Sequence, residues 1–173
     1  MCQGNVVAFA GSHEGSGFVK AVVQRVRKAS VTCGTQTQSI EAGLLVLLGV
    51  AEHDGLDESD WMAHRISHLR IFSDEVGKMR YAVKDHGLQV LVISQFTLLA
   101  DTSGGHRPSF GPAAAPEVAE PLYKRVVDRL RQTDGVGSVR TGMFGEAMQV
   151  ELVNDGPVTI MLDREPTPPL PRC

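Results

Sequence analysis

The chain has 173 residues, of which 42% are hydrophobic and 21% are charged, a composition typical of one globular domain. Its formal net charge of −3 at pH 7 excludes a protein that grips nucleic acid along the phosphate backbone, because such proteins carry a strong basic excess. The 3 cysteines, two of them at the chain ends, predict free thiols in a reducing, cytoplasmic compartment rather than a disulfide framework or a zinc site.

The two ends of the chain differ in composition from its middle. Residues 1–18 hold a short apolar run with no basic residues before it, so we interpret them as a flexible leader or a cloning remnant, not as a secretory signal. Residues 164–173 are rich in proline and predict a disordered tail. Because no apolar run is long enough to span a membrane, a single folded domain is expected over residues 19–163.

Three strands are predicted at the start of this domain. Residues 19–26 alternate between apolar and polar side chains, which favours a half-exposed strand. Residues 29–33 follow closely and are expected to pair back on it as a hairpin. Residues 43–50 form a continuous apolar run between glycines, which is typical of a buried strand.

A helix is predicted over residues 54–70, with Asp57 as its cap and an apolar stripe of Met62, Ile66 and Leu69. His64 and His68 have the i, i+4 spacing of metal ligands on a helix. Both fall opposite the apolar stripe, however, and the glutamate of a metalloprotease motif is missing between them. We therefore expect two solvated histidines and no metal site.

The second half of the domain contains a further strand and a further helix. A buried strand is predicted over residues 88–94. A helix is predicted over residues 116–132, where Val118, Leu122, Val126 and Leu130 recur every four residues. Pro121 is expected to delay or kink the start of this helix. The intervening loop, residues 100–116, is rich in Gly, Ser and Pro, and ordered loops of this length are often functional.

The domain is predicted to end in two short strands, residues 148–152 and 158–162, which gives the element order β-β-β-α-β-α-β-β. Between them lies Asn154-Asp155-Gly156-Pro157, in which Asn and Asp bond their own backbone and Gly permits unusual angles. An ordinary hairpin turn explains this segment. A cis Gly-Pro bond would instead turn both carbonyls in an uncommon direction, which matters only if main-chain atoms contact a ligand.

A second candidate segment directly follows the predicted strand 88–94. Ser94, Gln95, Phe96 and Thr97 stand where strand ends leave backbone donors free, and such ends are common ligand sites in α/β folds. Backbone N–H groups there could stabilise an oxyanion. Neither segment contains a histidine that could activate a hydroxyl, so a serine-type triad is not indicated. The alternative is a strand-ending turn with a buried phenylalanine.

Taken in order, Ser94-Gln95-Phe96-Thr97-Leu98 and Asn154-Asp155-Gly156-Pro157-Val158-Thr159 resemble the motif pair of the D-aminoacyl-tRNA deacylases. The likeness extends over about residues 20–163 and includes segments 21–26, 29–32, 43–50, 107–110 and 142–150. The departures from the family pattern, at Arg80, Ala82, His106 and Pro121, lie outside both motifs.

This resemblance implies a three-layer α/β fold in which mixed or antiparallel sheets are packed by two helices. It implies hydrolysis of the ester between a D-amino acid, or glycine, and the 3′-terminal adenosine of tRNA, with rejection of L-aminoacyl-tRNA. It also implies a homodimer whose segment around Asn154, Gly156, Pro157 and Val158 enters the partner's site, with a cis Gly156–Pro157 bond. No cofactor or metal is expected.

Within that resemblance we assign roles to the first motif. Thr97 is interpreted as a positioning group, and the backbone N–H groups of Phe96 and Thr97 as the oxyanion donors, with Ser94 and Gln95 beside them. A ribose hydroxyl of the substrate would help to activate water. Phe144 and Met148 are candidate walls for the terminal adenine, or plain core residues.

Two other functions remain open from the sequence. One is a nucleic-acid-binding accessory protein on the same fold, acting in DNA replication, which the net charge of −3 disfavours. The other is an editing module that acts in trans with a synthetase.

Overall fold

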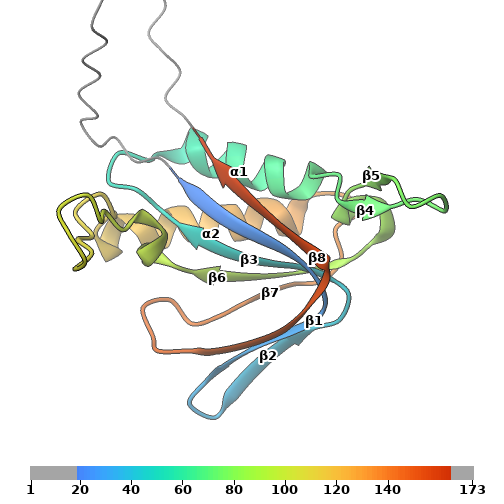
Figure 1. Ribbon diagram of the computed structural model, residues 1–173, viewed down its shortest axis with the longest axis horizontal. Helices are drawn as coiled ribbons and strands as arrows, with labels where there is room; N and C mark the ends of the chain where they lie inside the picture. Colours follow the sequence, from blue (N-terminus) through green and yellow to red (C-terminus); the bar gives the residue numbers. More distant parts are fainter. Residues whose placement is uncertain (1–18, 165–173) are drawn as a thin grey trace, which may run out of the picture.

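The computed structural model describes residues 19–164, which lie between the predicted leader and the predicted tail (Figure 1). The expectations for residues 1–18 and for most of the proline-rich tail fall outside the described residues. Within residues 19–164, no helix combines the length and the apolarity needed to cross a bilayer.

A mixed six-stranded sheet forms the centre of the domain, with strand order β2-β1-β3-β6-β7 and β8 paired to β1. Strands β3, β6 and β7 run parallel to one another, and the pairs that involve β1 are antiparallel. The strands are β1 (Lys20–Cys33), β2 (Gln36–Ile40), β3 (Gly43–Gly49), β6 (Gln89–Ser94), β7 (Val139–Thr141) and β8 (Gln149–Asp163). A separate small ribbon is made of β4 (Phe72–Ser73) and β5 (Met79–Tyr81).

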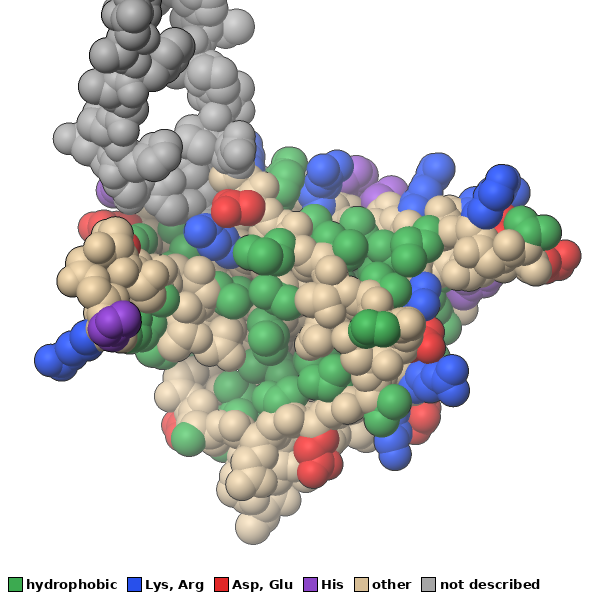
Figure 2. Space-filling model, viewed as in Figure 1, with side chains coloured by type: hydrophobic (Ala, Val, Ile, Leu, Met, Phe, Trp, Pro, Cys, Tyr) green, Lys and Arg blue, Asp and Glu red, His purple; other side chains and the backbone are tan. Residues whose placement is uncertain are grey.

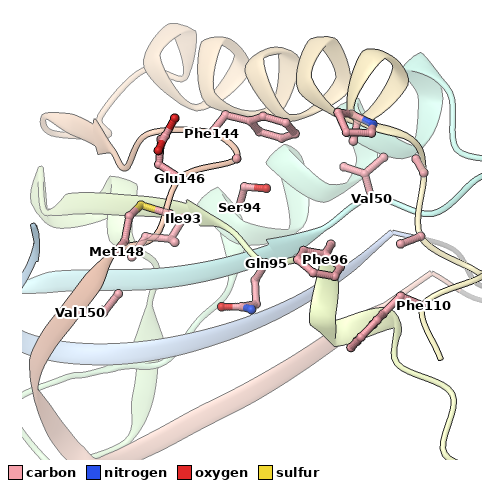
Figure 3. A pocket seen from close by; sticks show the side chains of 15 residues that line it. Val50, Ile93, Ser94, Gln95, Phe96, Phe110, Phe144, Glu146, Met148 and Val150 are labelled. Carbon is pink, nitrogen blue, oxygen red and sulfur yellow. The ribbon is translucent and has the colours of Figure 1, made fainter. Parts of the chain in front are cut away.

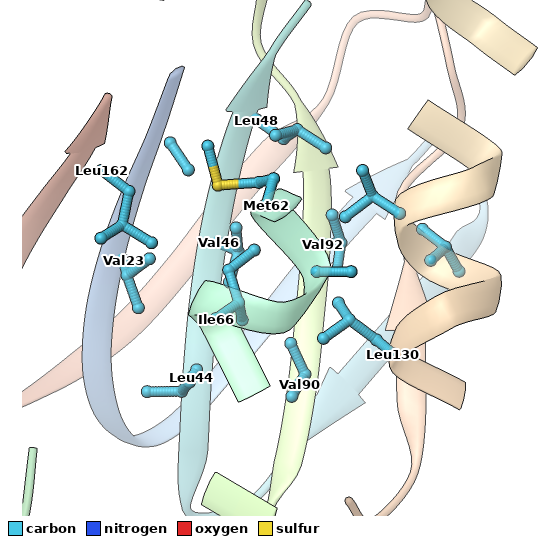
Figure 4. Packing of buried hydrophobic residues seen from close by; sticks show 14 of the residues in the cluster. Val23, Leu44, Val46, Leu48, Met62, Ile66, Val90, Val92, Leu130 and Leu162 are labelled. Atoms are coloured by element: carbon cyan, nitrogen blue, oxygen red, sulfur yellow. The ribbon is translucent and has the colours of Figure 1, made fainter. Parts of the chain in front are cut away.

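Two helices, α1 (Leu56–His68) and α2 (Pro116–Gln132), lie side by side against the sheet (Figure 1). Figure 4 shows Met62 and Ile66 of α1 and Leu130 of α2 facing Val46 and Val92 of the two central strands, and all five are fully buried. These contacts hold the two helices on the sheet. Truncating one such buried side chain to Ala lowers the free energy of unfolding by about 2–5 kcal/mol. The predicted α/β class with two packing helices is confirmed.

The first hairpin lies elsewhere than predicted. A single strand, β1, runs straight through Arg27 and Lys28, and the turn comes at Gly34 instead, where φ is +56°. The reason is that β1 pairs with β2 and β3 along one side and with β8 along the other. The exposed polar pair lies between the β3 ladder, which ends at Val26, and the β2 ladder, which begins at Ala29, and Lys28 pairs with Val153 of β8. The chain therefore stays extended through it.

The end of the chain also differs from the prediction. The two short strands predicted around residue 155 are one strand, β8, of 15 residues, and the short strand β7 was missed. The predicted order β-β-β-α-β-α-β-β therefore has the right class and the right two helices, but each predicted strand pair is one continuous strand, and β2, β4 and β5 were not predicted either.

The helices follow their predictions closely, with three corrections. Asp57 is not the cap of α1: Gly55 is, and the carboxylate of Glu58 accepts its N–H at 2.9 Å. Helix α2 has the predicted bounds and continues through Pro121, which lies near its N-terminal end. Val118 is 45% exposed and does not belong to the buried stripe. His64 and His68 lie exposed on α1, as expected, with their rings stacked at 4.0 Å.

Candidate active site

The first motif forms a tight turn at the end of the buried strand β6. Gln95 donates its backbone N–H to the carbonyl of Leu48 at 2.7 Å, which ties the turn to β3. A single 3₁₀ turn over Phe96–Leu99 then redirects the chain. Within residues 19–164, the backbone N–H groups of Phe96 and Thr97 have no acceptor. Both donors are therefore free to bind a ligand oxygen.

A cavity of about 620 Å³ opens beside this turn (Figure 3). Its lining is mostly apolar, with Phe96 and Phe110 at one end and Phe144 and Met148 at the other. The rings of Phe96 and Phe110 meet edge to face at 5.1 Å between centroids. The polar side chains in the lining are Ser94, Gln95 and Glu146. An apolar cleft with a few convergent polar groups is the usual form of a small-molecule site.

The wall that carries Phe110 belongs to the long loop, which is fastened to the end of β3. Ala114 donates to the carbonyl of Val50 at 3.0 Å, and Ala51 forms a bridge with Ala113. Asp54 in turn holds Ala51, whose N–H it accepts at 2.7 Å. Burial raises the pKa of this Asp54 carboxyl, against the opposing effect of its backbone hydrogen bonds. The predicted functional loop is thus ordered and shapes the cavity.

The opposite wall rests on helix α2. The ring of Phe144 lies 5.7 Å from that of Tyr123, whose hydroxyl donates to the carbonyl of Val92 at 2.9 Å. Burial raises the pKa of Tyr123, so its hydroxyl remains a neutral donor. Gly142 makes room for Met148, because a Cβ there would lie 2.5 Å from the Met148 sulfur. Phe144 is therefore both part of the core and part of the cavity wall.

The second motif is a bulge inside strand β8, not a hairpin turn. Gln24 pairs with Thr159 and Val26 with Asn154, so that Arg25 alone faces the four residues between them. The Gly156–Pro157 bond is cis, as the resemblance implied, and Gly156 has a φ of +125°. Gly156 and Pro157 are exposed, whereas Val158 is buried.

Arg25 packs under this bulge. Its Nε donates to the backbone carbonyl of Asp155 at 3.3 Å and lies 3.1 Å from that residue's carboxylate. A second guanidinium nitrogen donates to the carbonyl of Ile71. A Cβ added to Gly156 would lie 3.1 Å from Arg25 Nη2 and 2.7 Å from Val158 Cγ2. The bulge is thus closely packed on its inner side and open on its outer side.

The cavity brings together five of the predicted site residues: Ser94, Gln95, Phe96, Phe144 and Met148. Thr97 does not line it, because its hydroxyl turns to Gln95 and accepts a hydrogen bond from the Gln95 amide. The second-motif residues Asn154, Gly156, Pro157 and Val158 do not line it either. Within this single chain, the two motifs therefore do not form one site.

Three residues that the sequence reasoning did not single out belong to these sites. They are Phe110 and Glu146 in the cavity lining and Arg25 beneath the bulge. The signal for Arg25 was available, since an arginine in a strand that is otherwise half-buried needs a partner for its charge. Phe110 and Glu146 gave no such signal.

Strand β8 also carries exposed apolar side chains on both sides of the bulge. Val150 and Leu152 are each 37% exposed, Val153 is 43% exposed and Met161 is 75% exposed. Figure 2 shows hydrophobic side chains gathered across the middle of the face on which β8 lies. Exposed apolar side chains that gather on one face are common at protein–protein interaction sites.

The chain is similar to known proteins over nearly all of its described length. The family of D-Tyr-tRNA(Tyr) deacylases matches residues 22–163. The D-aminoacyl-tRNA deacylase of Chlorobaculum parvum is 51% identical over 146 residues, which is 84% of this chain and 97% of that protein. The enzyme of the same name from Symbiobacterium thermophilum is 50% identical over 151 residues, 87% of this chain and 99% of that protein.

Two solved structures have the same fold. The c-Myc DNA unwinding element binding protein superposes with a TM-score of 0.79 and 42% sequence identity, covering 85% of this chain and 99% of that one. A probable eukaryotic D-amino acid tRNA deacylase superposes with a TM-score of 0.74 at 15% identity, covering 84% and 99% of the two chains.

Proposed function

This chain belongs to the D-Tyr-tRNA(Tyr) deacylase family, and from that membership we propose that it hydrolyses the ester between a D-amino acid and the 3′-terminal adenosine of tRNA. The observation that carries the proposal is the cavity, whose lining includes Ser94, Gln95 and Phe96 of the first motif together with the aromatic side chain of Phe144. The backbone N–H groups of Phe96 and Thr97, which have no acceptor within residues 19–164, belong to the turn beside it. A cavity of about 620 Å³ has room for one aminoacyl-adenosine end rather than for a whole tRNA.

The first motif suggests how the ester is cleaved. The backbone N–H groups of Phe96 and Thr97 would bind the carbonyl oxygen as it becomes an oxyanion. A water molecule would attack the carbonyl carbon, the bond to the ribose oxygen would break, and that oxygen would take a proton. A neighbouring ribose hydroxyl would help to activate the water. Thr97 acts as a positioning residue, since its hydroxyl accepts from the Gln95 amide and lies outside the cavity lining.

Selection against L-amino acids would come from the second motif of another subunit. In a homodimer, the exposed Gly156 and Pro157 of one protomer would enter the cavity of its partner. Their main-chain carbonyls would then leave no room for an L side chain, whereas a D side chain would point outward. Glycine has no side chain to exclude, so glycyl-tRNA would also be a substrate. Two features support the dimer: the bulge lies outside its own chain's cavity, and strand β8 exposes apolar surface beside it.

The decisive experiment is hydrolysis of D-tyrosyl-, L-tyrosyl- and glycyl-tRNA by the full chain. Rapid loss of the D and glycyl esters with survival of the L ester is expected. Equal rates for the D and L esters would contradict the chiral filter, and no hydrolysis of any ester would contradict the proposed reaction. We place the protein in the cytoplasm, where aminoacyl-tRNA is used and where the free thiol of Cys33 would stay reduced.

A second candidate function rests on the similarity to the c-Myc DNA unwinding element binding protein. This chain could bind DNA on the same fold. A salt titration with duplex DNA separates the two functions: binding that survives about 200 mM salt would favour the DNA-binding protein. The net charge of −3 leads us to expect weak binding that is lost on addition of salt.

A further inference from the structure

Among residues 19–164, Glu146 is the one charged side chain that lines the cavity, and it is exposed to solvent. A tight turn places it: Glu146 donates its backbone N–H to the carbonyl of Met143 at 3.4 Å, and Gly145 supplies the φ of +77° that this turn needs. Within residues 19–164, the Glu146 carboxylate has neither an ion pair nor a hydrogen bond. It is free to accept from a ligand.

Its position in the cavity indicates which part of the substrate it would meet. Figure 3 shows Glu146 beside Phe144 and Met148, at the end of the cavity away from Phe96 and Phe110. If the ester lies at the Phe96 N–H groups, the nucleoside lies toward the Phe144 end. A base that stacks on an aromatic wall presents its edge sideways, where a neighbouring side chain can read it.

The chemistry of the Glu146 carboxylate indicates which group of the nucleoside it would contact. An ionised carboxylate only accepts hydrogen bonds, and adenine offers one exocyclic amine as a donor on its edge. We propose that Glu146 accepts a hydrogen bond from the exocyclic amine of the terminal adenine and thereby holds the base against Phe144 and Met148. This assignment rests on the proposed deacylase function. Glu146 is a binding residue and takes no part in bond cleavage.

The test compares Glu146→Ala and Glu146→Gln with the unaltered chain, using D-tyrosyl-tRNA. Because a lost hydrogen bond to a charged group weakens binding by about tenfold or more, Glu146→Ala should raise KM about tenfold and change kcat less than about twofold. Glu146→Gln keeps an acceptor oxygen and should recover most of the loss. Glu75→Ala is the matched control: it removes an exposed glutamate from the β4–β5 turn, outside the cavity lining, and should leave both constants unchanged.

A second substrate identifies the contacted group. D-tyrosyl-tRNA whose terminal nucleoside is purine riboside lacks the exocyclic amine. With it, the unaltered chain should show the raised KM, and Glu146→Ala should cause no further loss. A substrate with a hydroxyl in place of the α-amino group tests the competing contact, an ion pair with the α-ammonium. If the Glu146→Ala effect disappears with that substrate and Glu146→Gln fails to recover activity, the adenine assignment is wrong.

The outcomes separate this proposal from the deacylase function itself. If the unaltered chain hydrolyses D-tyrosyl-tRNA and Glu146→Ala has the same KM, only the Glu146 assignment is overturned. If the unaltered chain hydrolyses none of the esters, the proposed function fails, and competition between adenosine and purine riboside for the cavity still tests Glu146. Adenosine should then bind more tightly than purine riboside to the unaltered chain, and equally to Glu146→Ala. Equal binding to the unaltered chain would overturn the assignment.

Discussion

The Nε atom of Arg25 contacts two atoms of Asp155: it donates to the backbone carbonyl oxygen at 3.3 Å and lies 3.1 Å from a carboxylate oxygen. The two residues are far apart in the sequence and meet where β1 passes beneath the bulge of β8. The Arg25 side chain is only 11% exposed. Charge-assisted hydrogen bonds have preferred directions. We therefore infer that the contacts of Arg25 with Asp155 position the neighbouring Gly156 and Pro157.

We therefore expect Arg25→Met to damage the chiral filter more than the reaction. The substitution keeps an unbranched side chain but removes the guanidinium donors of Arg25 to Asp155 and Ile71. The ratio of the D-tyrosyl-tRNA to the L-tyrosyl-tRNA hydrolysis rate should fall at least tenfold. The reason is that charge-assisted hydrogen bonds contribute about 1.5–3 kcal/mol, and the bulge would lose this stabilisation. Single-turnover rates on both esters measure this ratio.

Arg27→Met is the matched control for this substitution. Arg27 contacts the same Asp155 carboxylate at 3.1 Å, but its side chain is 77% exposed. Solvent-exposed ion pairs contribute about 0–1 kcal/mol, so the D-to-L ratio should change little. If both substitutions lower the D-to-L ratio equally, the ratio depends on neutralising the Asp155 carboxylate and not on the buried contacts of Arg25 beneath the bulge.

Gly156→Ala should be more harmful to activity than an alanine at Gly77, another glycine with positive φ. The φ of Gly156 is +125°, and the added Cβ would lie 2.7 Å from Val158 Cγ2 and 3.1 Å from Arg25 Nη2. The bulge must then shift, so D-tyrosyl-tRNA hydrolysis should fall at least tenfold. Gly77→Ala is the control, because its φ is +81° but its Cβ would meet nothing within 4 Å. That substitution should cost only about 1 kcal/mol of stability and leave the rate unchanged.

Thr97→Ala distinguishes a positioning role from a nucleophilic one. The Thr97 hydroxyl accepts from the Gln95 amide and does not line the cavity. We expect the variant to keep most of its single-turnover rate, with a loss within about tenfold from the freed Gln95 side chain. A loss of about 10⁴-fold would instead identify Thr97 as the nucleophile. Gln95→Ala should reproduce the modest effect, because it removes the group that Thr97 positions.

The sequence predicted the packing elements well and the geometry of the second motif badly. The apolar runs that became β3 and β6, and the periodicity of α2, are local patterns that survive in the fold. Asn154-Asp155-Gly156-Pro157 has the composition of a turn, yet the partner strand β1 continues past it, and pairing on either side makes it a bulge. Such pairing is not visible in local composition. For the same reason, the half-buried strand around Arg25 indicates that its charge needs a partner, but neither segment alone identifies Asp155 as that partner.

Met161→Glu should prevent dimer formation if strand β8 forms the interface. Met161 is 75% exposed among the apolar side chains of this strand, and burying an unpaired carboxylate in an interface is strongly unfavourable. Sedimentation or light scattering should show a dimer for the unaltered chain and a monomer for the variant. The monomer should also lose discrimination between D and L esters. Val76→Glu, at an equally exposed apolar position of 77% in the β4–β5 turn, should remain dimeric.

Asp60 should make folding stability depend on pH in the acid range. Its carboxylate binds Arg125 and Arg129 of α2 at 2.7–3.0 Å, and these two hydrogen-bonded arginines hold the pKa of Asp60 well below its usual range. A depressed folded-state pKa stabilises the native state above the unfolded-state pKa of about 3.9 and loses that effect as the pH falls toward the folded value. The Asp60 side chain is 35% exposed, so solvent screening limits the contribution to about 1 kcal/mol.

Denaturant unfolding of Asp60→Asn should therefore show a free energy of unfolding about 1 kcal/mol below that of the unaltered chain at pH 7. The gap should stay constant down to about pH 5 and narrow below about pH 4, as the unaltered chain loses its advantage. Asp128→Asn supplies the control, because Asp128 is 60% exposed and, among residues 19–164, pairs only with Arg131 of its own helix, at 3.3 Å. The free energy of unfolding of Asp128→Asn should differ little from that of the unaltered chain over the whole pH range. A gap for Asp60→Asn that is the same at pH 3 and pH 7 would mean that the lost contact acts through packing between α1 and α2, and not through the charge of Asp60.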